Sequence, residues 1–118
     1  MRYKHFKNAG VDVSKLAVGT WAIGGARYGD ITEKDSIDAI RAMIDGGVNL
    51  IDTAPAYGVG HSERVVGEAI KGLDRSKILI STKFGVNHTT LRYQRDPENY
   101  VGRDNRFENC LYECEASL

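Results

Sequence analysis

Short apolar runs alternate with helical spacings of apolar residues along the chain. Residues 16–21, 48–51 and 77–82 each contain a compact apolar run of strand length. Each run is followed, directly or after a polar stretch, by apolar residues that recur every three or four positions, which is typical of an amphipathic helix. Because strands that are apolar throughout are buried under other elements, the alternation predicts a parallel sheet covered by helices.

Residues suited to helix ends flank these segments. Thr32 is a good N-cap for the first helix, and the pair Gly46-Gly47 is a common C-terminal signal. Ser62 is expected to cap the second helix, and the third is expected to begin near Asp104. The apolar stripes expected on the three helices are Ile37, Ile40, Met43 and Ile44; Val65, Val66, Ala69, Ile70 and Leu73; and Phe107, Cys110, Leu111, Cys114 and Leu118.

Two segments fall outside the alternation of strands and helices. Residues 2–6 and 11–16 are separated by Asn8-Ala9-Gly10, where Asn and Gly tolerate a positive φ, so we expect an N-terminal hairpin. Residues 84–102 are polar and show no periodicity, which predicts a long loop. The expected order is therefore a hairpin followed by three strand–helix units.

Composition excludes several classes of function. The chain of 118 residues carries 16 Lys plus Arg and 16 Asp plus Glu, so it lacks the positive charge of a nucleic-acid binder. No apolar run approaches the ~18 residues of a membrane span, and the start MRYKHFKNAG lacks the apolar core of a secretory signal. Cys110 and Cys114 are neighbours on one helical face, and no metal site is expected. These features predict a cytoplasmic protein.

Polar residues recur where the predicted strands end. Thr20, Asp52 and Lys83 follow one another at intervals of 32 and 31 residues, and one βαβ unit occupies about 30 residues. Each of the three is therefore expected at the carboxyl end of a successive strand. In parallel α/β folds ligands bind at that edge of the sheet.

Asp52, Lys83 and Tyr57 form a chemically useful combination at this edge. Tyr57 lies in the loop after Asp52, and a cation beside a phenol favours the phenolate, whereas an unperturbed tyrosine has a pKa near ~10. The phenol could then act as a general acid, with Asp52 holding Lys83 in place. A structural ion pair beside a packing tyrosine is the alternative interpretation of the same residues.

The run GGVNLIDTAPAYG at residues 46–58 resembles the signature of the aldo-keto reductases. Residues 16–21 (LAVGTW) and 80–83 (ISTK) are similar to the first and third barrel strands of that family. Residues 113–118 (ECEASL) are similar to its helix before the fourth strand. The resemblance therefore extends over almost the whole chain.

The resemblance implies an eight-stranded (β/α) barrel, the TIM barrel, that binds NADPH without a Rossmann domain. It also implies reduction of aldehydes or ketones to alcohols by hydride transfer from the nicotinamide. By position, Tyr57 is the proton donor, Lys83 adjusts its acidity, and Asp52 orients Lys83 beside the nicotinamide. Thr20 and Trp21 match cofactor-binding positions, and Trp21 and Tyr57 match positions that contact the substrate.

A complete barrel of this kind needs about 250 residues, so we expect residues 1–118 to be the N-terminal part of a single barrel domain, truncated before its fourth strand. The family's catalytic histidine ends that fourth strand and would follow Leu118. None of His5, His61 and His88 has a matching position. The chain alone is therefore expected to be inactive, and its motifs leave the oligomeric state open.

Two other functions are consistent with the same residues. One is a regulatory subunit on the same barrel, which binds the nucleotide with little turnover. The other is an unrelated (β/α) barrel in which Asp52 and Lys83 form only a structural pair. The enzyme is distinguished from both by carbonyl-dependent oxidation of NADPH that requires Tyr57.

Overall fold

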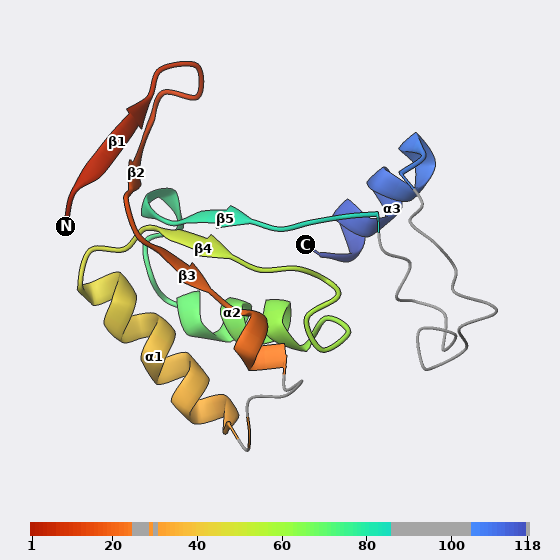
Figure 1. Cartoon of the computed structure of the whole chain (residues 1–118), viewed down its shortest axis with the longest axis horizontal. Coiled ribbons are helices and arrows are strands. Elements are labelled where there is room, and N and C mark those ends of the chain that lie inside the picture. Colours follow the sequence, from red (N-terminus) through yellow and green to blue (C-terminus); the bar gives the residue numbers. More distant parts are fainter. Residues whose placement is uncertain (25–28, 30, 86–104, 118) are drawn as a thin grey trace.

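Three parallel strands and two helices packed against them form the centre of the structure (Figure 1). The computed structural model describes residues 1–24, 29, 31–85 and 105–117. Its elements are β1 (Tyr3–Phe6), β2 (Val11–Ser14), β3 (Ala17–Gly19), the 3-10 helix η1 (Trp21–Gly24), α1 (Glu33–Asp45), β4 (Leu50–Asp52), α2 (His61–Ile70), the 3-10 helix η2 (Arg75–Lys77), β5 (Leu79–Ser81) and α3 (Phe107–Ala116).

The three strands lie in the order β3-β4-β5, and both pairs are parallel. Gly19 pairs with Asp52, and Asp52 pairs with Ser81, so the carboxyl ends of the strands are level. The predicted parallel sheet and the predicted order of strands and helices are confirmed. Among the described helices, none combines the length and the apolar character needed to cross a membrane.

The N-terminal hairpin is also confirmed. Strands β1 and β2 are antiparallel, and Gly10 in their turn has a φ of 64°. The hairpin is attached near the start of β4, where the Tyr3 hydroxyl donates to the carbonyl oxygen of Gly47 at 2.7 Å. The side chain of Asn49 binds the backbone N–H of Ser14 at 2.8 Å. The hairpin therefore lies at the end of the sheet opposite the strand carboxyl ends.

Helix α1 begins and ends as predicted, whereas α2 does not. The hydroxyl of Thr32 accepts from the N–H of Asp35 at 3.1 Å, and Gly46 is the C-cap of α1. The N-cap of α2 is Gly60, with a φ of 82°, and Ser62 lies inside the first turn with a buried side chain. The prediction that Ser62 caps α2 was wrong, because its hydroxyl binds the strand ends instead of a helix N–H.

Helices α1 and α2 cover one face of the sheet, and the core lies between them and the strands (Figure 1). The stripes expected on α1 and α2 enter this core except for Met43 and Leu73, which are each 38% exposed. Among the described residues of the stripe expected on α3, none is buried, and Phe107 is 71% and Leu111 is 50% exposed. The helix begins at Phe107, and the expected start at Asp104 lies outside the described residues, as does most of the loop expected over 84–102.

Arg41 joins the two packed helices through the end of α2. Its guanidinium donates from Nε to the carbonyl oxygen of Ala69 at 2.9 Å, and from Nη2 to those of Glu68 at 3.4 Å and Lys71 at 3.3 Å. These carbonyl groups lie at the C-terminus of α2, where helix hydrogen bonds are missing and the helix dipole favours a cation. The planar group of arginine suits several acceptors at once.

We predict that Arg41→Met lowers the free energy of unfolding by about 1–2 kcal/mol, because three carbonyl groups lose a charged donor. Lys34 provides the control, since it forms an ion pair with Asp38 on the same helix and its side chain is 82% exposed. Lys34→Met should change the free energy by less than about 0.5 kcal/mol. Urea unfolding measures both, and equal destabilisation by the two substitutions would contradict the role given to Arg41.

Candidate active site

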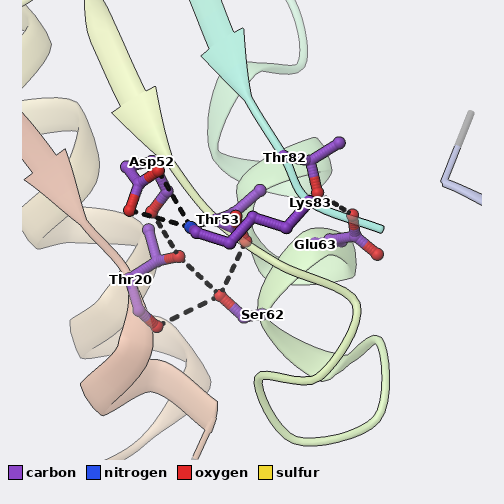
Figure 2. A network of polar contacts seen from close by, with 7 residues as sticks. All are labelled: Thr20, Asp52, Thr53, Ser62, Glu63, Thr82 and Lys83. Carbon is purple, nitrogen blue, oxygen red and sulfur yellow. Dashed lines mark hydrogen bonds and ion pairs between the residues drawn. The ribbon is translucent and has the colours of Figure 1, made fainter. Parts of the chain in front are cut away.

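Asp52 and Lys83 form an ion pair at the carboxyl edge of the sheet (Figure 2). The Nζ of Lys83 donates to the two carboxylate oxygens of Asp52 at 2.9 and 3.0 Å, and to the carbonyl oxygen of Thr53 at 2.9 Å. Asp52 ends β4 opposite Ser81, and alternate residues of an extended chain point to the same side. Lys83, two residues beyond Ser81, therefore reaches Asp52, as the spacing in the sequence predicted.

The environment of Lys83 keeps its ammonium group charged. Burial alone lowers the pKa of Lys83, but the hydrogen bonds and negative charge of Asp52, with a contribution from Tyr57, outweigh it, so the pKa is raised. The Lys83 side chain is 47% exposed and that of Asp52 is 41% exposed. The pair is thus fixed in geometry while both charged groups remain partly exposed to solvent.

Tyr57 lies beside this pair. The Nζ of Lys83 is 4.9 Å from the centre of the Tyr57 ring, which is within the range of a cation–π contact. The loop that carries Tyr57 is held by its own backbone, since the N–H of Tyr57 donates to Ala54 at 3.0 Å and its carbonyl oxygen accepts from Ser62 at 3.1 Å. The structure therefore brings a phenol, an ammonium and a carboxylate together at one edge.

A direct contact between two glycines fixes the position of the Tyr57 loop. A Cβ atom at Gly24 would lie 2.8 Å from the backbone nitrogen of Gly58 and 2.8 Å from the carbonyl carbon of Tyr57. A Cβ at Gly58 would lie 2.7 Å from the carbonyl oxygen of Gly24, and Gly58 has a φ of 68°. Glycine is needed at both positions, because the backbone of η1 packs directly on the loop.

The two remaining predicted site residues differ in their accessibility. Trp21 follows β3 and is 58% exposed at the carboxyl edge, where its ring can meet a ligand. Thr20 is 0% exposed, and its hydroxyl donates to the carbonyl oxygen of Asp52 at 3.0 Å. A direct cofactor contact by the Thr20 side chain stays a prediction that this burial does not favour.

Thr53 and Ser62 belong to the same edge, although the sequence did not single them out for it. The hydroxyl of Ser62 lies 2.7 Å from that of Thr20 and 3.1 Å from that of Thr53 (Figure 2). All three residues are at most 2% exposed. The sequence does contain a signal for these hydrogen bonds. A hydroxyl residue directly follows each of two strands, and a third lies in the first turn of the next helix.

A cavity of about 810 Å³ opens beside the ion pair. Its wall combines Tyr57 and Lys83 with apolar side chains that include Phe84 and Phe107. Glu113 of α3 also lines it and accepts a hydrogen bond from the N–H of Gly85 at 2.6 Å. The volume lies in the usual range of small-molecule sites, in which a few polar groups orient a largely apolar ligand.

The described residues fit the reactive end of a nicotinamide cofactor. The exposed ring of Trp21 offers a surface for stacking, and the carboxylate of Asp52 offers a hydrogen-bond acceptor at the same edge. Within the described ranges, no group of three or more His, Cys, Asp or Glu side chains could hold a metal ion.

Curated proteins with similar sequences include two named reductases. A sequence model described as the aldo/keto reductase family matches residues 15–118. The aldo-keto reductase YhdN of Bacillus subtilis (strain 168) is 49% identical over 84 residues, which cover 70% of this chain and 25% of that protein. The NADH-specific methylglyoxal reductase of Escherichia coli (strain K12) is 45% identical over 78 residues, covering 64% of this chain and 24% of that protein.

Solved structures with the same fold agree. A glycerol dehydrogenase, AKR11B4 from Gluconobacter oxydans, matches with a TM-score of 0.70 and 39% identity over 99% of this chain and 34% of that chain. An aldo-keto reductase from Klebsiella pneumoniae in complex with NADPH matches with a TM-score of 0.69 and 28% identity over 100% of this chain and 35% of that chain. The predicted fold class, part of a (β/α)₈ barrel with an N-terminal hairpin, is confirmed.

The chain spans about a quarter of the length of these curated relatives and about a third of the solved ones. The family match nevertheless covers residues 15–118, and the two solved structures match 99% and 100% of this chain. The sequence and the fold together show that the chain belongs to the aldo/keto reductase family.

Proposed function

We propose that residues 1–118 are the N-terminal part of a single barrel domain in an NADPH-dependent reductase of aldehydes and ketones. The observation that carries this proposal is the ammonium of Lys83, held by Asp52 and placed 4.9 Å from the Tyr57 ring. A solved relative, the aldo-keto reductase from Klebsiella pneumoniae, is in complex with NADPH, which supports this nucleotide. The apolar cavity beside the phenol supports a small carbonyl compound as substrate.

In this proposal the bound NADPH supplies the hydride that reduces the carbonyl carbon. Tyr57 donates its hydroxyl proton to the carbonyl oxygen as negative charge develops there. Lys83 stabilises the phenolate that remains, because its ammonium lies beside the ring and stays charged. Asp52 holds that ammonium in place through two hydrogen bonds.

Trp21 and Asp52 would hold the nicotinamide end of the cofactor. Trp21 would also contact the substrate. Thr20 would act on the cofactor site indirectly, through its hydrogen bond to the Asp52 backbone. The groups that bind the phosphates and the adenine, and the histidine of the fourth strand, would come from the rest of the barrel.

The proposed function is tested by following NADPH oxidation with a panel of aldehydes and ketones in the full-length protein. Carbonyl-dependent oxidation is the expected result. Tight nucleotide binding with negligible turnover would instead support the regulatory subunit. Residues 1–118 expressed alone should show no turnover, since three strands cannot enclose a cofactor.

We predict that Tyr57→Phe lowers kcat by about 10²–10⁴-fold, because it removes the proton donor and leaves the ring in place. Binding of NADPH, measured by fluorescence, should change little. Tyr112 is 55% exposed on α3 and provides the control. Tyr112→Phe should leave kcat unchanged, and full turnover by the Tyr57 variant would eliminate the proposed donor.

We predict that Gly24→Ala lowers kcat by about tenfold or more, because the added Cβ must push the Tyr57–Gly58 backbone away. Gly67 on α2 is the matched control, since a Cβ there would meet nothing within 4 Å. Gly67→Ala should keep kcat and raise stability by up to about 1 kcal/mol through helix propensity. Steady-state kinetics and thermal unfolding separate the two effects, and an unchanged kcat in Gly24→Ala would contradict the role of the glycine contact.

A further inference from the structure

Three buried hydroxyl groups connect the first turn of α2 to the ends of β3 and β4 (Figure 2). Ser62 stands in the middle, 2.7 Å from the hydroxyl of Thr20 and 3.1 Å from that of Thr53. Ser62 and Thr20 are 0% exposed, and Thr53 is 2% exposed. Because buried hydroxyl groups are costly without partners, these three depend on one another.

Each hydroxyl in this chain of hydroxyls donates to the next group, in the order Thr53, Ser62, Thr20 and the carbonyl oxygen of Asp52. The hydroxyl of Thr20 donates to the carbonyl oxygen of Asp52 at 3.0 Å, so it can only accept from Ser62. Ser62 therefore donates its single proton to Thr20. The proton is shared between the hydroxyl oxygen of Thr20 and its carbonyl oxygen, which lies 3.1 Å from the Ser62 hydroxyl. The hydroxyl of Thr53 in turn donates to Ser62. Removal of the Ser62 hydroxyl would take the acceptor from Thr53 and a donor from Thr20, while Thr20 would keep its bond to Asp52.

The chain of hydroxyls ends on the carbonyl oxygen of Asp52, the residue whose carboxylate binds Lys83. The ammonium of Lys83 donates to the carboxylate of Asp52 and to the carbonyl oxygen of Thr53. Asp52 in turn accepts a hydrogen bond from Thr20, and the hydroxyl of Thr53 bonds to that of Ser62. The next residue of the helix turn, Glu63, accepts a hydrogen bond from Thr82 at 2.6 Å. One turn of α2 thus contacts all three strand ends around Lys83 (Figure 2).

We propose that Ser62 is a positioning residue that sets the location of the Lys83 ammonium through the Asp52–Thr53 peptide. Its hydroxyl acts on the site without touching substrate or cofactor, since it is fully buried. The effect on turnover rests on the proposed reductase function, whereas the effect on Lys83 does not.

The test compares Ser62→Ala and Thr53→Val with Ser36→Ala in the full-length protein. Ser36 is a matched control because it is 5% exposed on α1 and its hydroxyl donates to the carbonyl oxygen of Thr32 at 3.1 Å, away from the site. The primary readout is the rate of acetylation of Lys83 by trace acetic anhydride across alkaline pH, measured by peptide mass spectrometry. Only the neutral amine reacts, so the midpoint of the profile reports the pKa of Lys83.

In Ser62→Ala the midpoint should move to lower pH, because a looser contact with Asp52 lets burial lower the pKa of Lys83. Thr53→Val should cause a shift in the same direction, and the double variant should shift no further than Ser62→Ala. The kcat of Ser62→Ala should fall by about tenfold with a smaller change in KM, since the acid is misplaced and not removed. Ser36→Ala should leave both readouts unchanged.

An unchanged Lys83 profile in Ser62→Ala, or an equal shift in Ser36→Ala, would overturn the positioning role. If Ser62→Ala does not fold, Thr53→Val and Ser62→Cys answer the same question, because they weaken the chain of hydroxyls with little change in volume. A wild-type protein without carbonyl-dependent NADPH oxidation would remove the proposed function, while a shifted Lys83 profile would still support the positioning role.

Discussion

The ion pair between Lys83 and Asp52 determines how the carboxyl edge of the sheet is arranged. Both side chains are more than a third exposed, and an ion pair in such surroundings contributes at most about 1 kcal/mol. Its importance is therefore geometric. Three acceptors on two adjacent residues hold one ammonium, and that ammonium lies against the ring of Tyr57.

The precision of this pair comes from backbone and buried polar contacts beneath it. The level ends of β4 and β5 place Asp52 and Lys83 on the same side. The close contact of Gly24 with Gly58 brings the loop that carries Tyr57 toward them. Backbone contacts therefore hold the exposed, charged side chains of this edge in place. Such support suits a site that orients a reacting group within a fraction of an ångström.

Relatives with this segment carry different names, among them an NADH-specific methylglyoxal reductase and a glycerol dehydrogenase. This variety agrees with a division of labour in barrel enzymes, where the strand ends supply the reacting groups and the loops select the substrate. In the proposed reductase, Asp52 and Lys83 at the strand ends and Tyr57 in the loop after β4 would be the reacting groups.

The sequence by itself determined the order of elements, the parallel sheet, the hairpin and the meeting of Asp52 with Lys83, because apolar periodicity and an interval of about 30 residues are properties of the chain. Only the tertiary structure decided that Ser62 turns inward instead of capping α2, that Phe107 stays exposed on α3, and that Gly24 packs on Gly58. Periodicity shows which face of an element is apolar, whereas these three outcomes depend on which distant segment comes to lie against it.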